Sequence, residues 1–449
     1  MKKTQWLKII AFMLIFCFGF GVIQKIVSNA DYRNYQWVRG FYAEEDDSLD
    51  AVYLGSSNCY AFWNPLAAWE KYGIAVWPYA SSAQPIIATE HLMKEVRKTQ
   101  PDAVFVVNTN NIGEAAFSAP AVHNLLDYMP FSFNKLSLTH RLASAGDFTK
   151  AQIKGFYIPM IRYHSRWNSL VAEDFSHPLN GYKGAAHYST YLGDVLDITD
   201  KYITIADCKN TKDVPFDEPT EAAVNSLINY CLNENVEVVF VTVPRANEKT
   251  ELVKIDKLNR MLAEAGLDVL DLTEKLDETG IDPADDYYNE THTNIHGSIK
   301  FTQYVSEYLI EKYGFENKRS DPAYTSWNEG LENYKSTYMN KYVLDYELDP
   351  DVRDYTLPTP ENLTAEAKNK SVVLSWDACE GADGYVIYKK DSENSNLYLL
   401  SSTKDTTFTD SEVAAGSGNV YGYTVAPYRL ADGKAFYGDA VYQPVYAQP

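Results

Sequence analysis

The stretch Asp50-Ala51-Val52-Tyr53-Leu54-Gly55-Ser56-Ser57-Asn58-Cys59-Tyr60 decides the fold of this chain. Residues 51–54 form a short apolar run, which predicts a buried parallel strand that stops at Gly55. Two serines follow at once. A serine on a tight turn between a strand and a helix has its hydroxyl raised off the sheet edge, with backbone N–H groups pointing the same way. An acyl-transferring nucleophile needs this geometry, although glycine and serine are also ordinary loop residues.

A second informative stretch, Asn289-Glu290-Thr291-His292-Thr293-Asn294-Ile295-His296-Gly297, precedes the apolar-periodic residues 299–313. A histidine just before a helix is well placed to face the carboxyl ends of parallel strands, where α/β sheets hold their sites. The sequence therefore predicts that His292 and Ser57 meet at one edge of the sheet.

Together the two stretches resemble the SGNH (GDSL-like) hydrolase and acyltransferase superfamily, most closely its envelope-associated branch with D-alanyl-transfer and alginate-acetylation proteins. That family has a Gly-x-Ser turn after its first strand and an Asp-x-x-His segment before its last helix. The resemblance covers about residues 48–316. It implies Ser57 as nucleophile and His292 as base. It also implies oxyanion donors from the backbone N–H of Ser57, the small-residue loop around Ser82, and Asn110, which fits a Gly-x-Asn-Asp slot if Asn108 replaces the glycine.

The chain departs from the family at Asn289, where the family usually has an aspartate. An asparagine carbonyl can still accept a hydrogen bond from Nδ1–H of the histidine, but it supplies no charge, so a weaker base is expected. Asp286 or Glu290 could be the partner instead. A Ser-His dyad and a domain that binds without turnover also stay open.

The order of the predicted elements indicates an α/β fold, a three-layer α/β/α sandwich with a mostly parallel sheet of about five strands. Strands are expected at residues 51–54, 74–79, 103–107, 236–243 and 267–272, and helices at 65–72, 86–98, 218–234, 252–266 and 299–313. An insertion at about 114–200 interrupts this rhythm. Its polar-aromatic cluster with His164, Arg166 and Trp167 is a candidate for substrate contact, or else a satisfied core network.

Four domains or segments are expected: a membrane anchor or signal segment at 1–30, the hydrolase-like domain at 31–316, a connector at 317–356 and a C-terminal module at 357–449. Residues 31–49 read as a stalk or a first helix. The C-terminal module has short alternating strands separated by turn signals, which predicts an all-β sandwich. With Trp376 on an early strand and Tyr421 on a late one, it resembles a fibronectin type III module, and it carries no catalytic cluster.

The amino-acid composition limits which partners, metals and disulfides are expected for this chain. The formal net charge of −21 argues against nucleic acid or anionic headgroups as partners of the main body. The five cysteines fit neither a zinc site nor a disulfide framework, although Cys208 and Cys231 could pair. We expect no metal and no cofactor.

The N-terminus has lysines at positions 2, 3 and 8, and then an apolar run to residue 23. This pattern predicts an uncleaved single span with the body outside the cytoplasm, or a signal peptide that is removed. The resemblance then implies an extracytoplasmic serine esterase or O-acyltransferase acting on acyl esters, acetyl foremost, of envelope or extracellular glycans, with a membrane-bound acyl donor as a further partner. The alternative is a catalytically weak or inactive surface glycan-binding protein. A lipase is disfavoured because no apolar lid is evident.

Overall fold

The computed structural model of the chain describes residues 3–28, 35–112, 118–170, 174–175, 195–208, 211–334, 354, 356–368, 370–390, 398–411, 413, 420–431, 434–441 and 444–449. Residues 335–353 and 355 of the predicted connector, and residues 114–117, 171–173 and 176–194 of the predicted insertion, lie outside these ranges. The predicted domain boundaries therefore stay predictions.

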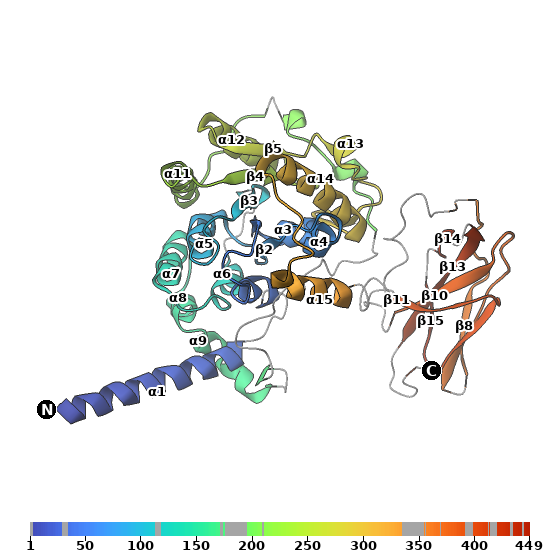
Figure 1. Ribbon diagram of the computed structural model, residues 1–449, viewed down its shortest axis with the longest axis horizontal. Helices are drawn as coiled ribbons and strands as arrows, with labels where there is room; N and C mark the ends of the chain where they lie inside the picture. Colours follow the sequence, from blue (N-terminus) through green and yellow to red (C-terminus); the bar gives the residue numbers. More distant parts are fainter. Residues whose placement is uncertain are drawn as a thin grey trace.

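A parallel five-stranded sheet forms the centre of the first body, as predicted for an α/β protein (Figure 1). Its strands are β1 (Ala51–Gly55), β2 (Val76–Ala80), β3 (Val104–Asn108), β4 (Val238–Thr242) and β5 (Asp268–Asp271), in the order β2-β1-β3-β4-β5. The order runs outward from β1 in both directions. Because the strands are parallel, the loops after β1, β2, β3 and β4 all lie at the carboxyl edge of the sheet. α/β proteins bind ligands at this edge, where the strand order changes direction.

Both faces of the sheet are covered because successive residues of a buried strand point to opposite faces and are apolar on both. Val52 and Leu54 of β1 join one core cluster, and Ala51 and Tyr53 join the other. The first cluster includes residues of α5 (Thr89–Val96), α11 (Glu218–Asn233) and α12 (Lys249–Glu264), and the second includes residues of α3 (Ser57–Phe62) and α14 (Ile295–Tyr313). The sheet is therefore the middle layer between helices, which Figure 1 shows.

The segment before β1 is part of the body. η1 (Tyr35–Arg39) is a single π-helical turn, and Trp37, Val38 and Phe41 are buried. The Phe41 ring stacks on that of Tyr79, with 4.9 Å between the centroids, and the Trp77 indole donates to the Trp37 carbonyl at 3.1 Å. The expectation of a stalk is wrong for these residues, since the aromatic side chains cover the edge of the sheet.

Two further groups of helices complete the body. α4 (Pro65–Tyr72) packs against α15 (Thr325–Tyr334), where the Trp69 indole donates to Asn328 at 3.0 Å. The other group is α6 (Ala119–Leu126), α7 (Phe133–Ala145), α8 (Lys150–Tyr157) and α9 (Met160–Tyr163), and it lies beside α1 (Lys3–Ser28). The remaining short elements are η2 (Ile86–Ala88), η3 (Asn110–Ile112), η4 (His164–Asn168), η5 (Thr199–Lys201), η6 (Ala206–Cys208), α13 (Leu276–Thr279), β6 (Tyr287–Asn289), β7 (His292–Thr293) and η7 (Pro322–Tyr324).

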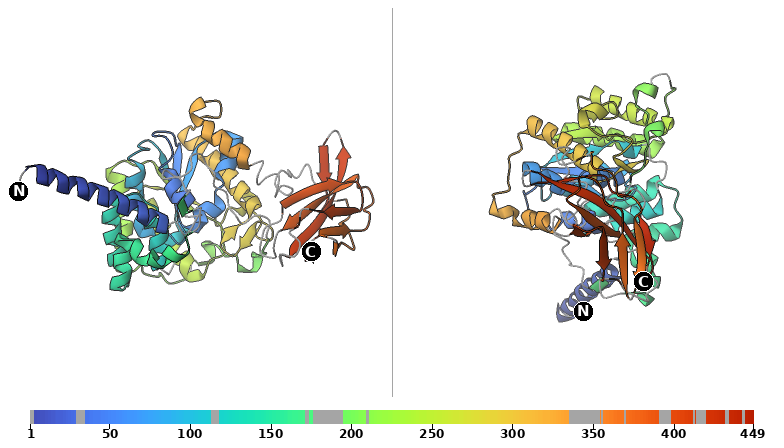
Figure 2. Two further views of the ribbon diagram at one scale, coloured as in Figure 1. Left: turned by 90° about the horizontal axis from the view of Figure 1, so that it is seen from below. Right: turned by 90° about the vertical axis from the view of Figure 1, so that its right-hand side faces the viewer.

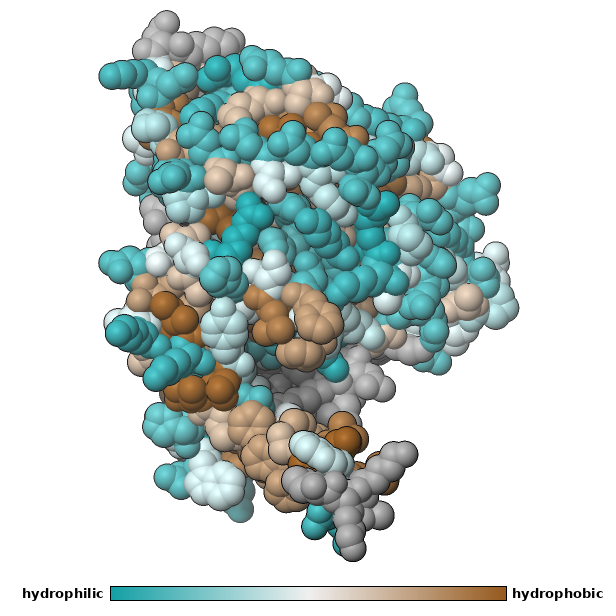
Figure 3. Space-filling model, turned by 90° about the vertical axis from the view of Figure 1, so that its left-hand side faces the viewer, coloured by the Kyte–Doolittle hydropathy of each residue, from teal (hydrophilic) through white to brown (hydrophobic). Residues whose placement is uncertain are grey.

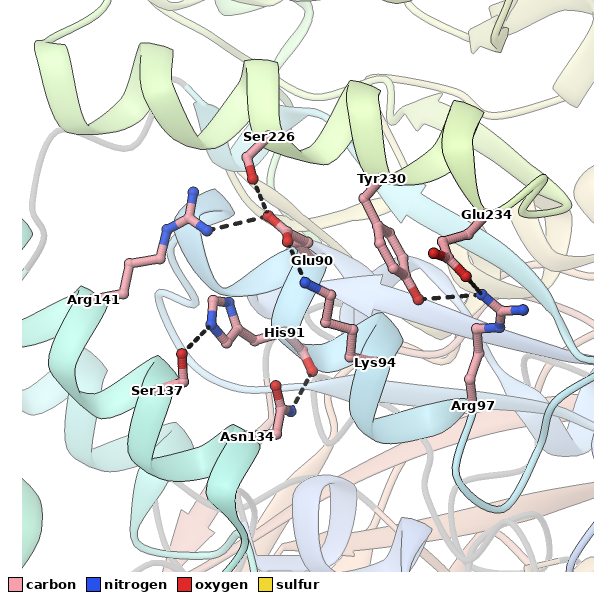
Figure 4. A network of polar contacts seen from close by, with 10 residues as sticks. All are labelled: Glu90, His91, Lys94, Arg97, Asn134, Ser137, Arg141, Ser226, Tyr230 and Glu234. Carbon is pink, nitrogen blue, oxygen red and sulfur yellow. Dashed lines mark hydrogen bonds and ion pairs between the residues drawn. The ribbon is translucent and has the colours of Figure 1, made fainter.

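Glu90 joins α5, α7 and α11 through a polar network (Figure 4). Its carboxylate accepts from Ser226 Oγ at 2.6 Å and lies 3.1 Å from Arg141 Nη1 and 2.5 Å from Lys94 Nζ. Burial alone would raise the pKa of Glu90, but these hydrogen bonds and positive charges outweigh it and lower the pKa to about 2. The network fixes the three helices on one face of the sheet.

The C-terminal module is an antiparallel β-sandwich. One sheet pairs β12 (Thr407–Asp410), β9 (Ser371–Ser375) and β8 (Thr364–Lys368). The other pairs β11 (Tyr398–Thr403), β10 (Gly384–Lys390) and β13 (Tyr421–Ala431), with β14 (Lys434–Tyr437) and β15 (Val445–Ala447) both along β13. Leu374 from the first sheet and Ile387 from the second share one core. The predicted all-β module is confirmed at the level of a sandwich of the fibronectin type III or immunoglobulin-like kind.

Candidate active site

The turn after β1 presents Ser57 at the carboxyl edge of the sheet. A Cβ added at Gly55 would lie 2.7 Å from Asn108 Cβ, so only glycine lets the ends of β1 and β3 approach this closely. Ser56 is the N-cap of α3, and Ser57 is its first residue. Ser57 is half-buried, so its hydroxyl sits in the wall of the body rather than inside the core.

The hairpin of β6 and β7 carries His292 to the same place. His292 Nε2 lies 2.7 Å from Ser57 Oγ, although 235 positions separate the two residues in the chain. The hairpin is held on both sides: Thr293 Oγ1 donates to the Ala61 carbonyl at 2.7 Å, and the Ala246 N–H donates to the Glu290 carbonyl at 2.9 Å. The distance lies within the range that direct proton transfer between a nucleophile and its base requires.

Asn289 orients the imidazole and sets its tautomer. Asn289 Oδ1 lies 3.0 Å from His292 Nδ1 and also accepts from the Thr291 backbone N–H at 2.9 Å. A backbone N–H can only donate, so the atom facing it must be the oxygen of the carboxamide. The same oxygen then requires a proton on Nδ1, which leaves the lone pair of Nε2 free to accept from Ser57. The arrangement gives the tautomer that a general base needs, without a carboxylate.

The two acidic alternatives to Asn289 are occupied elsewhere. Asp286 is buried and paired with Lys300 at 2.7 Å, and it accepts from the Asp282 N–H. Glu290 forms an ion pair with Lys201. The side chain that contacts Nδ1 at the shortest distance is therefore the amide of Asn289, and the imidazole faces no negative charge from these two residues.

Burial and the nearby charge of Arg245 lower the pKa of His292 to about 4. Arg245 is itself buried and follows β4, where the predicted site edge lies. The sequence places Arg245 at the active-site edge because it follows a buried parallel strand, but no role was predicted for it. His292 is consequently neutral, and able to accept a proton, at any pH well above 4.

The loop after β2 lies beside this pair. Tyr60 of α3 shares a hydrogen bond of 2.9 Å with Ser82 Oγ, which ties the loop to the nucleophile helix. Ala83 adopts a left-handed backbone conformation, with φ of +54°, and the Gln84 N–H closes the turn on the Ser81 carbonyl at 3.1 Å. An alanine in this region is strained, and such strain gathers at functional sites. Ser82 is thus close to α3, as an oxyanion loop would have to be.

Asn110 is placed differently from the prediction. Its side chain is fully buried, with Oδ1 accepting from the Val243 N–H at 2.8 Å and Nδ2 donating to the Val243 carbonyl at 3.2 Å. Both ends of the carboxamide therefore join the ends of β3 and β4. The role of Asn110 as an oxyanion donor is corrected to a bridge between strands, because a buried amide satisfied in this way does not face a substrate.

The polar-aromatic cluster of the insertion is also placed differently. Arg166 Nη1 donates to the Val27 carbonyl at 2.7 Å, and its Nη2 pairs with Asp174 at 2.7 Å, so this cluster lies at the end of α1. His164 and Trp167 belong to the same short helix η4. The described part of the insertion thus folds against the N-terminal helix, and substrate contact by these three residues stays a prediction.

Two cavities are found at this end of the molecule, and neither includes Ser57 or His292 in its lining. One of about 280 Å³ lies between α1 and helices α6–α8, and one of about 340 Å³ lies between α6, α8 and α9. Among the residues that the structure describes, no group of three or more His, Cys, Asp or Glu side chains could hold a metal ion. Cys208 and Cys231 are free thiols, so the pairing left open by the sequence is not formed.

Comparison with known proteins gives matches to parts of the chain. No protein-family model matches it. An amylopullulanase from Thermoanaerobacterium thermosulfurigenes is 35% identical over 99 residues, which is 21% of this chain and 5% of that protein. One from Thermoanaerobacterium saccharolyticum is 34% identical over 146 residues, 32% of this chain and 11% of that protein. The matches span so little of these relatives that their activity is not carried over.

Solved structures similar to the chain include fibronectin type III domains. A Fn3-like protein from Clostridium thermocellum is 21% identical, with a TM-score of 0.16, over 20% of this chain and 91% of that one. The fn3 domain of the human collagen alpha-1(XX) chain is 19% identical, also with a TM-score of 0.16, over 20% and 84% of the two chains. These scores are low, and the assignment of the C-terminal module rests on its own strand pairing.

Proposed function

We propose that this chain is an extracytoplasmic serine esterase or O-acyltransferase of the SGNH hydrolase-like kind, acting on acyl esters of glycans. The observation that carries the proposal is the contact of 2.7 Å between Ser57 Oγ and His292 Nε2 at the carboxyl edge of a parallel sheet. The neutral imidazole, with its lone pair on Nε2, supports the same reading.

Each step of the reaction uses groups that are already in place. Ser57 Oγ attacks the ester carbonyl while Nε2 of His292 takes the hydroxyl proton. The imidazolium then gives this proton to the oxygen of the departing alcohol, and the acyl group stays on Ser57. Water or an acceptor hydroxyl, deprotonated by the same nitrogen, releases it. Throughout, Nδ1–H donates to Asn289, which holds the ring in position.

The oxyanion of the tetrahedral intermediate needs hydrogen-bond donors close to Ser57. The backbone N–H of Ser57 belongs to the first residue of α3, and such groups have no partner inside their own helix. The loop of Ser82, tied to α3 through Tyr60, is the second candidate. With the side chain of Asn110 committed to Val243, the proposed hole depends on backbone groups.

The substrate class follows from the family resemblance, which implies acyl groups, acetyl foremost, on envelope or extracellular glycans. α1 is long and apolar enough to act as a signal anchor or membrane span, with a mean hydropathy of 2.3 over its most apolar window. It would hold the body at the outer surface near such glycans and near a membrane-bound acyl donor. Hydrolase and transferase use one acyl-enzyme, and access of water to it decides between them.

The alternative function is binding of surface glycans with weak or no turnover. The observation that favours it is Asn289, which supplies no negative charge to stabilise the imidazolium. The two functions differ in whether Ser57 reacts.

A fluorophosphonate probe tests the proposal, because it labels only serines that are activated as nucleophiles. We expect the full-length protein to be labelled and the variant Ser57→Ala to be unlabelled. Ser137→Ala is the matched control, since Ser137 Oγ also contacts a histidine, His91 Nε2, at 3.2 Å. Labelling that survives Ser57→Ala, or no labelling between pH 5 and pH 9, would contradict the proposed enzymatic activity and favour the binding function.

A further inference from the structure

α1 and the main body are in direct contact. The last turn of α1 is held by the Arg166 guanidinium, which donates to the Val27 carbonyl at 2.7 Å, and by the Met160 N–H, which donates to Gln24 at 3.4 Å. The N-terminal part of α1 extends away from the body (Figures 1 and 2). The end of α1 therefore has a defined position relative to helices α6–α9.

If α1 crosses a bilayer, the position of its end relative to the body sets the depth at which the body meets that bilayer. About 20 apolar residues cross the roughly 30 Å of hydrocarbon, so a span that starts at Gln5 reaches the outer boundary near Gln24. Gly21 and Gln24 line the 280 Å³ cavity together with Phe131 and Tyr157 of the body. Since these residues share one cavity, Phe131 and Tyr157 lie at the level where the hydrocarbon ends.

Apolar side chains at this level are exposed to a degree that is unusual for a folded body. Phe133 is 86% exposed and Phe131 is 76% exposed, the highest values among the large hydrophobic residues of the described chain. We define the α1-side face as Phe131, Phe133, Leu136, Tyr157, Ile158 and Ile161, all of which are exposed. Figure 3 looks onto this end of the molecule and shows apolar side chains gathered beside and above the N-terminal helix.

The two phenylalanines are held outward by their neighbours. Ser132 caps α7 by accepting from the Lys135 N–H at 3.0 Å, and Asn134 Nδ2 donates to the His91 carbonyl at 2.7 Å (Figure 4). Phe131 and Phe133 flank Ser132, so their backbone is fixed while their rings meet solvent. Fixed exposure of this kind marks an interaction surface.

We propose that the α1-side face inserts into the headgroup region of the same bilayer that α1 crosses, so that lipid covers it. Apolar side chains that sit in the interface are typically buried by about 5–10 Å. With a net charge of −21 the body gains nothing from anionic lipid, so contact comes from the apolar side chains. The body would then lie on the membrane rather than stand away from it.

The test uses the full-length chain, with α1 retained, in phosphatidylcholine nanodiscs that contain a spin-labelled quencher lipid. Cys17, the one exposed cysteine of the described chain, is replaced by serine, so that Phe133→Cys supplies the only exposed thiol among the described residues and carries an environment-sensitive fluorophore. Leu232→Cys is the matched control, because Leu232 is 49% exposed near the end of α11, a helix that Figure 1 shows in the upper part of the body while α1 leaves it below. We expect blue-shifted emission and about threefold stronger quenching at position 133 than at position 232.

Equal quenching at the two positions would overturn the proposal. Emission at position 133 that is blue-shifted but insensitive to the quencher lipid, and that reverts when each nanodisc holds only one chain, would show instead that a second copy covers the face. As a second variant, Phe131→Glu with Phe133→Glu should abolish the quenching of a label at Tyr157→Cys. Both phenylalanines are exposed, so the fold should survive, and an unchanged thermal melt checks this.

Discussion

His91 and His292 each contact a serine hydroxyl through Nε2, at 3.2 Å from Ser137 Oγ and at 2.7 Å from Ser57 Oγ. For both, burial and a nearby arginine lower the pKa to about 4. The pairs differ in what surrounds them. His292 Nδ1 donates to Asn289, whereas His91 Nδ1 is buried with no hydrogen-bond partner among the described residues. A low histidine pKa and a serine contact are therefore not enough to define a site.

The Ser57–His292 and Ser137–His91 pairs also differ in where they lie in the fold. Ser57 is the first residue of a helix that follows a buried strand, so its hydroxyl stands at the carboxyl edge of the sheet. Ser137 lies within α7, on a helix that packs against α5, and its pair belongs to the network around Glu90 (Figure 4). We infer that the first pair reacts and the second supports the fold, and the following experiments test this difference.

The largest effect is expected from removing the base. His292→Gln should lower turnover of a soluble acetyl ester by about 10³-fold, because Ser57 loses the group that takes its proton. His91→Gln should leave turnover within about twofold of the unmodified protein, since its imidazole contacts no reacting group. Steady-state kinetics on the three proteins measure both. If the two variants lose activity equally, the distinction between the pairs is wrong.

Changes in the network around Glu90 should lower the stability of the fold without changing turnover. Glu90→Gln removes the buried carboxylate that joins three helices and should cost about 2 kcal/mol of unfolding free energy at pH 7. Its control is Glu234→Gln in the same network, an exposed carboxylate 3.6 Å from Arg97, for which we expect less than about 0.5 kcal/mol. Neither change should alter the rate constant of the Ser57 site. Urea denaturation measures the loss of unfolding free energy, and ester hydrolysis measured in parallel checks that the rate constant is unchanged.

The pH dependence of this cost has a definite sign. The pKa of Glu90 is lowered to about 2 in the folded chain, so its stabilisation is present above the unfolded pKa of about 4.5 and is lost as the pH falls toward 2. The difference in unfolding free energy between the original chain and Glu90→Gln should therefore shrink on acidification through this range. A difference that is constant with pH would mean that the carboxylate charge contributes nothing.

The sequence predicted the parts of this site that depend on local pattern. An apolar run that stops at Gly55 specifies a buried strand and a turn, and the segment before a periodic helix specifies the place of His292. The structure gives Asn110 and Arg166 partners other than those predicted, for a physical reason. Their positions after a strand and in a polar cluster were read correctly, but their hydrogen-bond partners, Val243 and Val27, lie more than a hundred positions away in the chain. No local pattern encodes such a partner.

A smaller effect tests what distinguishes the reactive pair. Asn289→Asp would place a carboxylate 3.0 Å from Nδ1, at the distance now held by the amide oxygen. The negative charge favours the imidazolium, so it should raise the pKa of His292 and increase turnover by about tenfold. Asn289→Leu, which removes the acceptor, should decrease turnover. Unchanged rates for both variants would mean that Asn289 does not orient the base.

The smallest effect concerns the charge next to His292. Catalysis needs neutral Nε2, so kcat/KM should fall only as the pH drops toward about 4, well below the usual 6.5 of a histidine. Arg245→Gln removes a positive charge that opposes protonation, so the pKa of His292 should rise and the acid limb should move to higher pH. Because burial is the larger cause, we expect a shift of about half a pH unit.

Two controls separate charge from folding in this last experiment. Arg245→Lys keeps the charge, so its acid limb should stay near that of the original chain even if packing changes. Arg260→Gln removes an exposed arginine that pairs with Asp256 at 3.0 Å on α12, and it should not move the limb. If the acid limb does not move in Arg245→Gln, or if it moves equally in all three variants, the low pKa of His292 comes from burial alone. In that case Arg245 would not help to keep His292 neutral, and burial of the imidazole would be the sole cause of its low pKa.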